Sequence, residues 1–124
     1  MEKKLIIIDI DDTLLKRDGT PIQHVIDYVN SIYDTKVIVT GRNSSKRLKT
    51  VAQLHNAGIN YDRLVMNPGN YQDSHKFKGQ VAQEFGFVTT LAIENNASAR
   101  AAYEKFGVKT LDPALIPQEL DMLE

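Results

Sequence analysis

Two aspartates stand close together near the start of the chain, directly after an apolar segment. Residues 5–8 read Leu-Ile-Ile-Ile, and Asp9 and Asp11 follow with one isoleucine between them. In an extended strand, side chains two positions apart point to the same side, so both carboxylates would face one place. Two neighbouring carboxylates repel each other and need a shared proton or a cation. Mg²⁺ is a suitable cation because it prefers carboxylate, carbonyl and water oxygens.

Polar residues also accompany other elements of the chain. Thr40 comes after the apolar residues 37–39, Glu94 comes after residues 91–93, and Lys78 stands near the start of a helical pattern. A bound phosphate dianion explains this set of side chains. Thr40 and Lys78 would hold the phosphate oxygens. Mg²⁺ would let the dianion approach the aspartates, since like charges about 4 Å apart repel by several kcal/mol at intermediate dielectric.

This set of side chains predicts phosphoryl transfer through a covalent intermediate. Asp9 can attack phosphorus and form an acyl-phosphate. Asp11 can protonate the leaving oxygen and then deprotonate the water that hydrolyses the intermediate. The expected activity is therefore a magnesium-dependent hydrolysis of phosphomonoesters.

Short apolar segments alternate with helical patterns along the chain. Strands are expected at residues 5–8, 37–39, 64–66, 91–93 and 108–111, the last at an edge of the sheet. Helices are expected after Thr20-Pro21 and at about residues 44–57, 76–86 and 98–106. This alternation is typical of an α/β fold with a parallel sheet covered by helices on both faces. Ligands of such sheets bind at the carboxyl ends of the strands, where the polar residues stand.

Helix boundaries are predicted from capping and terminating residues. The segment from Thr20 to Gln23 has the form of a capping box, with Pro21 at the first helical position. Glycines stand where helix terminators are expected, at Gly58, Gly86 and Gly107.

Two features allow a structural or a substrate-binding interpretation. Arg42 could bind a substrate phosphate or form a surface ion pair. Residues 61–78 place Tyr71 among basic side chains. We interpret this stretch mainly as a solvated loop, the alternative being a surface on which the tyrosine stacks a base.

The bulk properties are those of one soluble domain spanning residues 1–124, with a core at about 4–112 and an amphipathic, acidic tail at 113–124. The net charge of -1 gives no overall signal for nucleic acid, although it leaves room for a local basic patch. The chain has no cysteine, which excludes a thiol nucleophile and fits a cytoplasmic location. No segment has the apolar length of a signal peptide or a membrane span, so no membrane partner is expected.

Four motifs together resemble those of the haloacid dehalogenase (HAD) superfamily. They are Ile-Ile-Ile-Asp9-Ile-Asp11-Asp-Thr13-Leu, Val-Ile-Val-Thr40-Gly41-Arg42, Phe-Lys78-Gly-Gln-Val and Leu-Ala-Ile-Glu94-Asn95-Asn, in that order. The resemblance covers about residues 4 to 112, and Lys76 is an alternative to Lys78 as the motif lysine. Within the superfamily, the chain most resembles the 3′-phosphatase domain of phage-type polynucleotide kinase, through Val-Thr-Gly-Arg, Leu-Ala-Ile and Glu-Lys-Phe-Gly-Val.

The resemblance implies a Rossmann-like three-layer sandwich with strand order 5-4-1-2-3. It implies Asp9 as nucleophile, Asp11 as acid/base, and catalytic contributions from Thr40 and Lys78. Substrate contacts would come from Thr13, Gly41 and Arg42. Mg²⁺ would lie on the Asp9 carboxylate and the Asp11 backbone carbonyl, with Glu94 or Asn95 as a further ligand.

The chain departs from the superfamily pattern in two places. At the position where the fourth motif usually carries an acid, this sequence has Asn95, which can bind a metal through oxygen but brings no charge. The gaps after the first two motifs are too short for a cap domain. An uncapped site suits a large substrate such as a nucleic-acid end or a phosphoprotein, or a small one if a neighbouring subunit closes the site.

Two other functions compete with a phosphatase. A signalling receiver domain has a similar length, fold and Asp/Thr/Lys set. It carries its phosphoacceptor after the third strand, where this chain has Met66-Asn67. A catalytically weakened binding module is the second alternative, and Asn95 is the reason to consider it.

Overall fold

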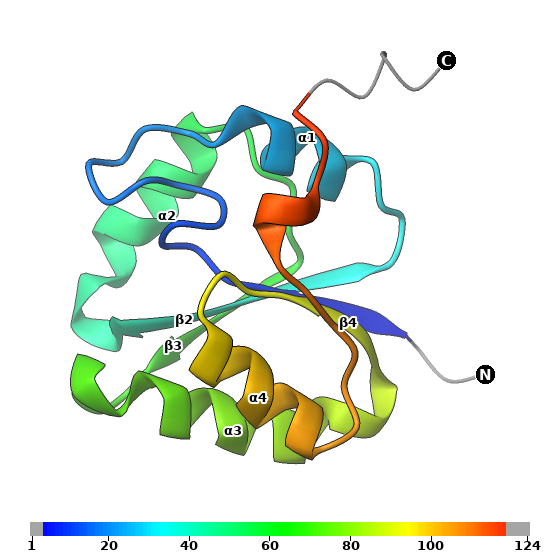
Figure 1. Ribbon diagram of the computed structural model, residues 1–124. Coiled ribbons are helices and arrows are strands. Elements are labelled where there is room, and N and C mark those ends of the chain that lie inside the picture. The colour runs from blue at the N-terminus through cyan, green and yellow to red at the C-terminus, as the bar shows by residue number, and fades with distance from the viewer. Residues whose placement is uncertain (1–3, 119–124) are drawn as a thin grey trace.

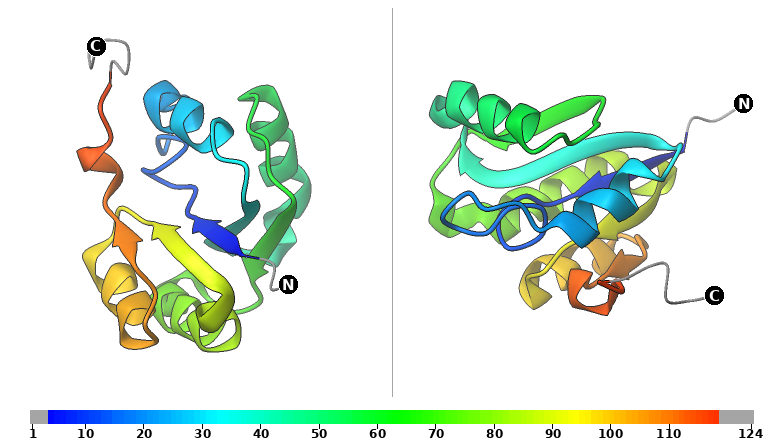
Figure 2. Two further views of the ribbon diagram at one scale, coloured as in Figure 1. Left: turned by 90° about the vertical axis from the view of Figure 1, so that its right-hand side faces the viewer. Right: turned by 90° about the horizontal axis from the view of Figure 1, so that it is seen from above.

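The apolar segments form the strands of one sheet in the computed structural model, which describes residues 4–118. All strand pairs are parallel. The strands are β1 (Leu5–Ile8), β2 (Thr35–Asn43), β3 (Arg63–Asn67), β4 (Thr89–Ile93) and β5 (Thr110–Leu111). Their order is β3-β2-β1-β4-β5, so the expected order 5-4-1-2-3 and the edge position of the last strand are confirmed. Figure 2 shows β1 in the middle of the sheet from two further directions.

Alternation along β1 divides the apolar core into two halves. Ile6 and Ile8 belong to one buried cluster with Val25 and Leu54, whereas Ile7 belongs to another. A strand whose successive side chains are buried on opposite faces needs covering on both sides. The continuous apolar run of β1 is therefore explained by the three-layer architecture.

Helices form the outer two layers. Their bounds are α1 (Gln23–Asn30), α2 (Arg47–Asn56), α3 (Ser74–Phe85) and α4 (Ala97–Lys105). Figure 1 shows α1 and α2 on one face of the sheet and α3 and α4 on the other. Two of the predicted terminators, Gly58 and Gly107, have φ of +71° and +81°, a conformation that favours glycine.

The predicted capping box at the start of α1 is wrong. The residue before the helix is Ile22, and no side chain caps the first turn. The backbone of Thr20 accepts a hydrogen bond from Lys16, and Ile22 donates to Leu14, so the chain is still paired in a short hairpin where the helix was expected. Pro21 belongs to this hairpin rather than to the helix.

Helix α3 begins earlier than predicted, and residues 61–78 are not mainly a loop. β3 occupies Arg63–Asn67, a short 3₁₀ turn covers Tyr71–Asp73, and α3 starts at Ser74. The error arose because the apolar pattern begins only after the first turn of the helix. The earlier start places Ser74 and His75 at the carboxyl-end edge of the sheet, beside the site described below.

The end of the described chain closes one side of the core. Pro113–Leu115 form a short 3₁₀ turn, and Ile116 is buried in the cluster that contains Ile6 and Ile8. The rest of the predicted amphipathic tail, residues 119–124, lies outside the described residues. No helix within residues 4–118 has the length and apolar character needed to cross a membrane.

Candidate active site

The carboxyl ends of β1 and β4 and the start of α3 surround a pocket, here called the Asp9 pocket. Its polar lining includes Asp9, Asp11, Lys78, Glu94 and Asn95. The pocket holds about 220 Å³, enough for a phosphoryl group but not for a large substrate. The beginnings of α3 and α4 also open onto it, and helix N-termini stabilise anions. Among the described residues, no inserted domain covers this edge of the sheet.

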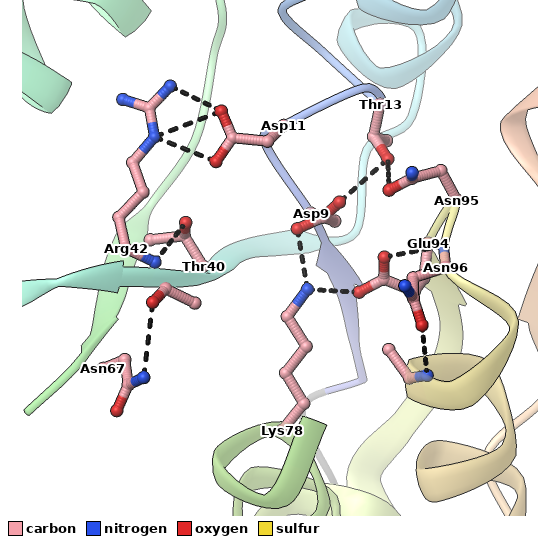
Figure 3. A network of polar contacts seen from close by, with 12 residues as sticks. Asp9, Asp11, Thr13, Thr40, Arg42, Asn67, Lys78, Glu94, Asn95 and Asn96 are labelled. Atoms are coloured by element: carbon pink, nitrogen blue, oxygen red, sulfur yellow. Dashed lines mark hydrogen bonds and ion pairs between the residues drawn. The ribbon is translucent and has the colours of Figure 1, made fainter. Parts of the chain in front are cut away.

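Asp9 lies at the base of the pocket and is held from two sides. Its backbone N–H donates to the Ile93 carbonyl at 3.0 Å, which fixes the end of β1 against β4. One carboxylate oxygen accepts from Lys78 Nζ at 2.8 Å, and the other accepts from Thr13 Oγ1 at 3.0 Å. The carboxylate therefore has a fixed orientation, as Figure 3 shows.

A tight turn after β1 brings Thr13 back onto Asp9. Asp12 has φ of 61°, a left-handed conformation that aspartate tolerates better than most residues. The Thr13 N–H then donates to the Ile10 carbonyl at 3.1 Å. The structure thus places the Thr13 side chain against the carboxylate and not in the lining of the Asp9 pocket.

Lys78 joins two buried carboxylates. Its ammonium group donates to both Asp9 and Glu94, and Glu94 is only 1% exposed. The second Glu94 oxygen accepts from the Asn96 N–H at 3.1 Å. Lys76 lines a different pocket, with Pro68 and Phe77. Of the two candidate lysines, Lys78 is therefore the one that contacts Asp9.

The buried group carries a charge imbalance. One ammonium cannot neutralise two carboxylates, so Asp9, Lys78 and Glu94 together have a net charge of about -1 when all are ionised. Burial raises the pKa of Asp9 to about 7, Lys78 opposes this shift, and Glu94 adds to it. Burial alone would lower the pKa of Lys78, but the two carboxylates raise it above 10.5. A cation near Asp9 would relieve the imbalance.

Asp11 belongs to a second network that centres on Arg42. The guanidinium group contacts both Asp11 oxygens, with Nη2 to Oδ1 at 2.8 Å and Nε to Oδ2 at 3.0 Å. Arg42 is itself held by Gln53 at 2.6 Å and Thr50 at 3.1 Å, both from α2. Such a bidentate pair fixes the carboxylate in position. In this structure Arg42 is thus in an ion pair, and it lies outside the Asp9 pocket.

Thr40 and Gly41 support the site from the end of β2. Thr40 is fully buried, does not line the Asp9 pocket, and accepts from the Arg42 N–H at 3.1 Å. Gly41 lines the pocket, and a Cβ built there would lie 2.4 Å from the Ser74 Cβ. Gly41 therefore allows the first turn of α3 to approach β2.

Asn95 brings an oxygen-rich cluster to the pocket. One terminal atom of its amide lies 2.8 Å from Asp9 Oδ2, 3.0 Å from the Asp11 carbonyl oxygen and 3.1 Å from Glu94 Oε2. As the amide nitrogen, this atom donates to its oxygen neighbours, and both ends of the amide are satisfied. As an oxygen, it completes a cluster of acceptors that a cation would stabilise.

The spacing of these oxygens suits Mg²⁺. Octahedral Mg²⁺ has bonds of about 2.0–2.1 Å, which separates adjacent ligand oxygens by about 3 Å. The Asn95 amide atom lies at about this distance from the Asp9 carboxylate and from the Asp11 carbonyl oxygen. Within residues 4–118, no group of three or more acidic or histidine side chains is arranged to hold a metal. The donor set thus combines side-chain and main-chain oxygens, and it fits a hard cation.

Several residues of the pocket were not predicted as site residues. Arg17 comes from the hairpin after β1, and its position depends on a turn that leaves little trace in the apolar pattern. Ser74 and His75 were missed because α3 was expected to start later. The other polar lining residues outside the predicted site set are Asp12, Asn96, Ser98 and Tyr71, of which Tyr71 was considered only as a base-stacking alternative.

Comparisons with known proteins identify the fold. No protein family and no curated protein matches the chain. The similar solved structures include two Pnkp1/Rnl/Hen1 complexes, one of them described as an RNA repair complex. The TM-scores are 0.71 and 0.77, each at 17% identity over 90% of this chain. The chain spans only 42% and 46% of the two matched chains. At this identity the likeness shows a shared fold.

Proposed function

We propose that the chain is a phosphomonoester hydrolase of the HAD type in which Asp9 is the nucleophile. The observation that carries this proposal is the buried Asp9 carboxylate, oriented by Lys78 and Thr13 at the base of a polar pocket. Two buried acids that share one ammonium cost stability, and such arrangements are concentrated at functional sites. The similarity to a chain of an RNA repair complex is compatible with this chemistry.

The proposed reaction has two steps. A carboxylate oxygen of Asp9 forms a bond to phosphorus while the bond from phosphorus to the leaving oxygen breaks, and Asp11 gives that oxygen a proton. Asp11 then takes a proton from water, whose oxygen attacks phosphorus and breaks the bond to Asp9. Inorganic phosphate leaves, and both aspartates return to their starting states.

The surrounding groups stabilise the phosphoryl group during both steps. The N-termini of α3 and α4 present positive charge to the pocket, and the Lys78 ammonium lies between Asp9 and Glu94 in its lining. Arg42 holds Asp11 in the absence of substrate. In our proposal an arriving anion draws the guanidinium away, and Asp11 then takes up from solvent the proton that it gives to the leaving oxygen. Mg²⁺, held by the Asp9 carboxylate, the Asp11 carbonyl and Asn95, would offset the repulsion between the carboxylates and the phosphate.

The substrate is proposed to be large or to extend beyond the pocket. The Asp9 pocket accommodates a phosphoryl group, and no cap encloses it among the described residues. A polynucleotide 3′-phosphate end meets this requirement, and the RNA repair complex among the similar structures favours it. A small phosphomonoester, enclosed by a neighbouring subunit, is the alternative enzyme function.

Hydrolysis of p-nitrophenyl phosphate tests the proposal. We expect turnover that requires Mg²⁺, stops in EDTA, and falls on the order of 10⁴-fold in Asp9→Asn, since removing a nucleophile has effects of this size. Asp34→Asn makes the same chemical change at an exposed position and should retain full activity. Folded wild-type protein without Mg²⁺-dependent turnover would instead support a binding module, the alternative suggested by the uncharged Asn95.

A further inference from the structure

A second groove lies beside the Asp9 pocket, on the side of α2. Its cationic and aromatic lining consists of Arg17, Arg42, Lys46, Lys49 and Tyr71, here called the basic groove. It is larger than the Asp9 pocket, at about 350 Å³. The two share Asp11, Arg17 and Tyr71 as lining residues, so they lie side by side. A ligand whose phosphate occupies the Asp9 pocket can therefore extend into the basic groove.

The charge of this groove is opposite to that of the whole chain. Four cationic side chains line it against one acidic side chain, whereas the chain has a formal net charge of -1. Asp11 neutralises Arg42, and Arg17 has an exposed partner in Asp12. Lys46 and Lys49 form no ion pair with any of residues 4–118. Positive charge remains available in the groove.

Helix stability does not account for these lysines. Both stand at the beginning of α2, and the first turn of that helix has no acidic residue. Cations at a helix N-terminus are unfavourable because the helix dipole is positive there. Their position therefore reinforces the positive potential of the helix end, and an anion bound in the groove would meet both.

Tyr71 lies where the pocket and the groove meet. Its side chain is a large apolar group that remains 59% exposed, although α3 begins only three residues later. An exposed aromatic ring beside cations along a groove is the usual arrangement for binding single strands, because every base can stack on the ring.

We propose that the basic groove binds a single-stranded polynucleotide whose terminal phosphate enters the Asp9 pocket. Lys46, Lys49 and Arg17 would contact the internucleotide phosphates next to the terminus, and Tyr71 would stack on an unpaired base. The assignment of the terminal phosphate rests on the proposed hydrolase function, whereas the binding of the strand does not.

Binding is measured first, with Asp9→Asn protein, so that no turnover interferes. The probe is a fluorescent, 3′-phosphorylated oligouridylate, followed by anisotropy as a function of salt. Lys46→Ala with Lys49→Ala should make the plot of log affinity against log salt less steep by about 1.4, since each phosphate contact contributes about 0.7 for single strands. The exposed pair Lys105→Ala with Lys109→Ala removes the same charge at the other end of the sheet and should leave the slope unchanged.

Tyr71 is tested in the same assay. Tyr71→Leu should weaken binding by roughly five- to a hundredfold, the usual effect of losing one base stack, while Tyr71→Phe should bind like the parent protein. Equal effects of the two substitutions would overturn the stacking role. Tighter binding of a blunt duplex than of the single strand would overturn the assignment of a single-strand site.

Turnover separates this proposal from the hydrolase proposal. In protein that retains Asp9, Lys46→Ala with Lys49→Ala should raise KM for the phosphorylated oligonucleotide about tenfold or more. The same double variant should leave hydrolysis of p-nitrophenyl phosphate unchanged. If the salt slope and KM match those of the Lys105 and Lys109 control, the groove proposal is wrong even if the protein is an active phosphatase. Conversely, an inactive protein that still shows the predicted salt slope would contradict only the hydrolase function.

Discussion

Asp9 is a buried carboxylate in an electrostatically unfavourable place. It is buried with a second carboxylate, Glu94, yet it is fixed by Lys78 and Thr13 in one orientation. The shared ammonium leaves one negative charge uncompensated, and the pKa of Asp9 rises to about 7 as a result of burial. A nucleophile of this kind would be fully ionised only when a cation or a higher pH favours the charged form.

The raised pKa predicts a pH-dependent cost to stability in metal-free buffer. The protonated form of Asp9 is favoured by folding, so its contribution is present below the unfolded pKa of 3.8 and is lost as pH rises through about 7. Asp9→Asn cannot ionise. From about pH 4.5 to about pH 8, its free energy of unfolding should increase relative to wild type by on the order of 2–3 kcal/mol.

Urea unfolding in EDTA at these two pH values measures the difference. Asp34→Asn, at an exposed position, should follow the wild-type pH profile. The free energy of unfolding of Asp9→Asn minus that of wild type should increase as pH rises. A difference that stays constant or decreases would show that the fold does not raise the pKa of Asp9.

Individual site residues differ in how well the sequence predicted their surroundings. Asp9, Lys78 and Glu94 stand at strand or helix ends, and the geometry of a parallel sheet brings such ends together, so their contact could be expected. The ion pair between Arg42 and Asp11 could not be expected from the sequence. The two residues are 31 positions apart, and their contact depends on side-chain conformations that residue spacing does not encode. Arg17 was missed for the same kind of reason.

At the scale of elements, the site depends on how closely α3 approaches the end of β2. The first turn of α3 lies against Gly41, where Ser74 leaves no room for a side chain, and Lys78 of the same helix contacts Asp9. The local requirement at Gly41 is therefore steric. The glycine positions the helix that carries the lysine.

Gly41→Ala should destabilise the protein by about 1–3 kcal/mol, the usual cost of overpacking, and should reduce turnover by shifting α3. Ser74→Gly removes the atoms that the new Cβ would meet at 2.4 Å and 3.2 Å, and leaves only the Ser74 Cα at 3.6 Å. The double variant should therefore recover most of the lost turnover. Thermal unfolding and p-nitrophenyl phosphate hydrolysis of the three variants test this, and equal activity of Gly41→Ala with and without Ser74→Gly would contradict it.

Element boundaries were predicted less well than the elements themselves. The β-branched segments at 5–8 and 37–39 identified the central strands because a doubly covered strand is apolar throughout. The start of α1 was misplaced because a hairpin uses the backbone groups of Thr20 and Ile22. The start of α3 was misplaced because Ser74 and His75 face the pocket instead of the core.

At the scale of the whole molecule, the sheet is a support for one polar edge. Two apolar clusters, one on each face, hold β1 and β4 side by side, and the acidic residues follow directly from these two strands. The strand order and the location of the site at the carboxyl edge followed from the alternation of apolar and helical segments. The basic groove could not be predicted from this alternation. Its residues come from a hairpin, the start of α2 and a 3₁₀ turn, and nothing in the sequence indicates that these three segments lie together.

The central claim is that Asp9 carries the phosphoryl group during turnover. Rapid acid quenching during hydrolysis of p-nitrophenyl phosphate with Mg²⁺, followed by peptide mass spectrometry, tests it most directly. Our account predicts a phosphorylated peptide that contains Asp9 and is absent from Asp9→Asn. Hydroxylamine should remove its phosphoryl group, as expected for an acyl-phosphate. Active wild-type protein with the phosphoryl group on another residue, or with turnover that persists in Asp9→Asn, would contradict the account.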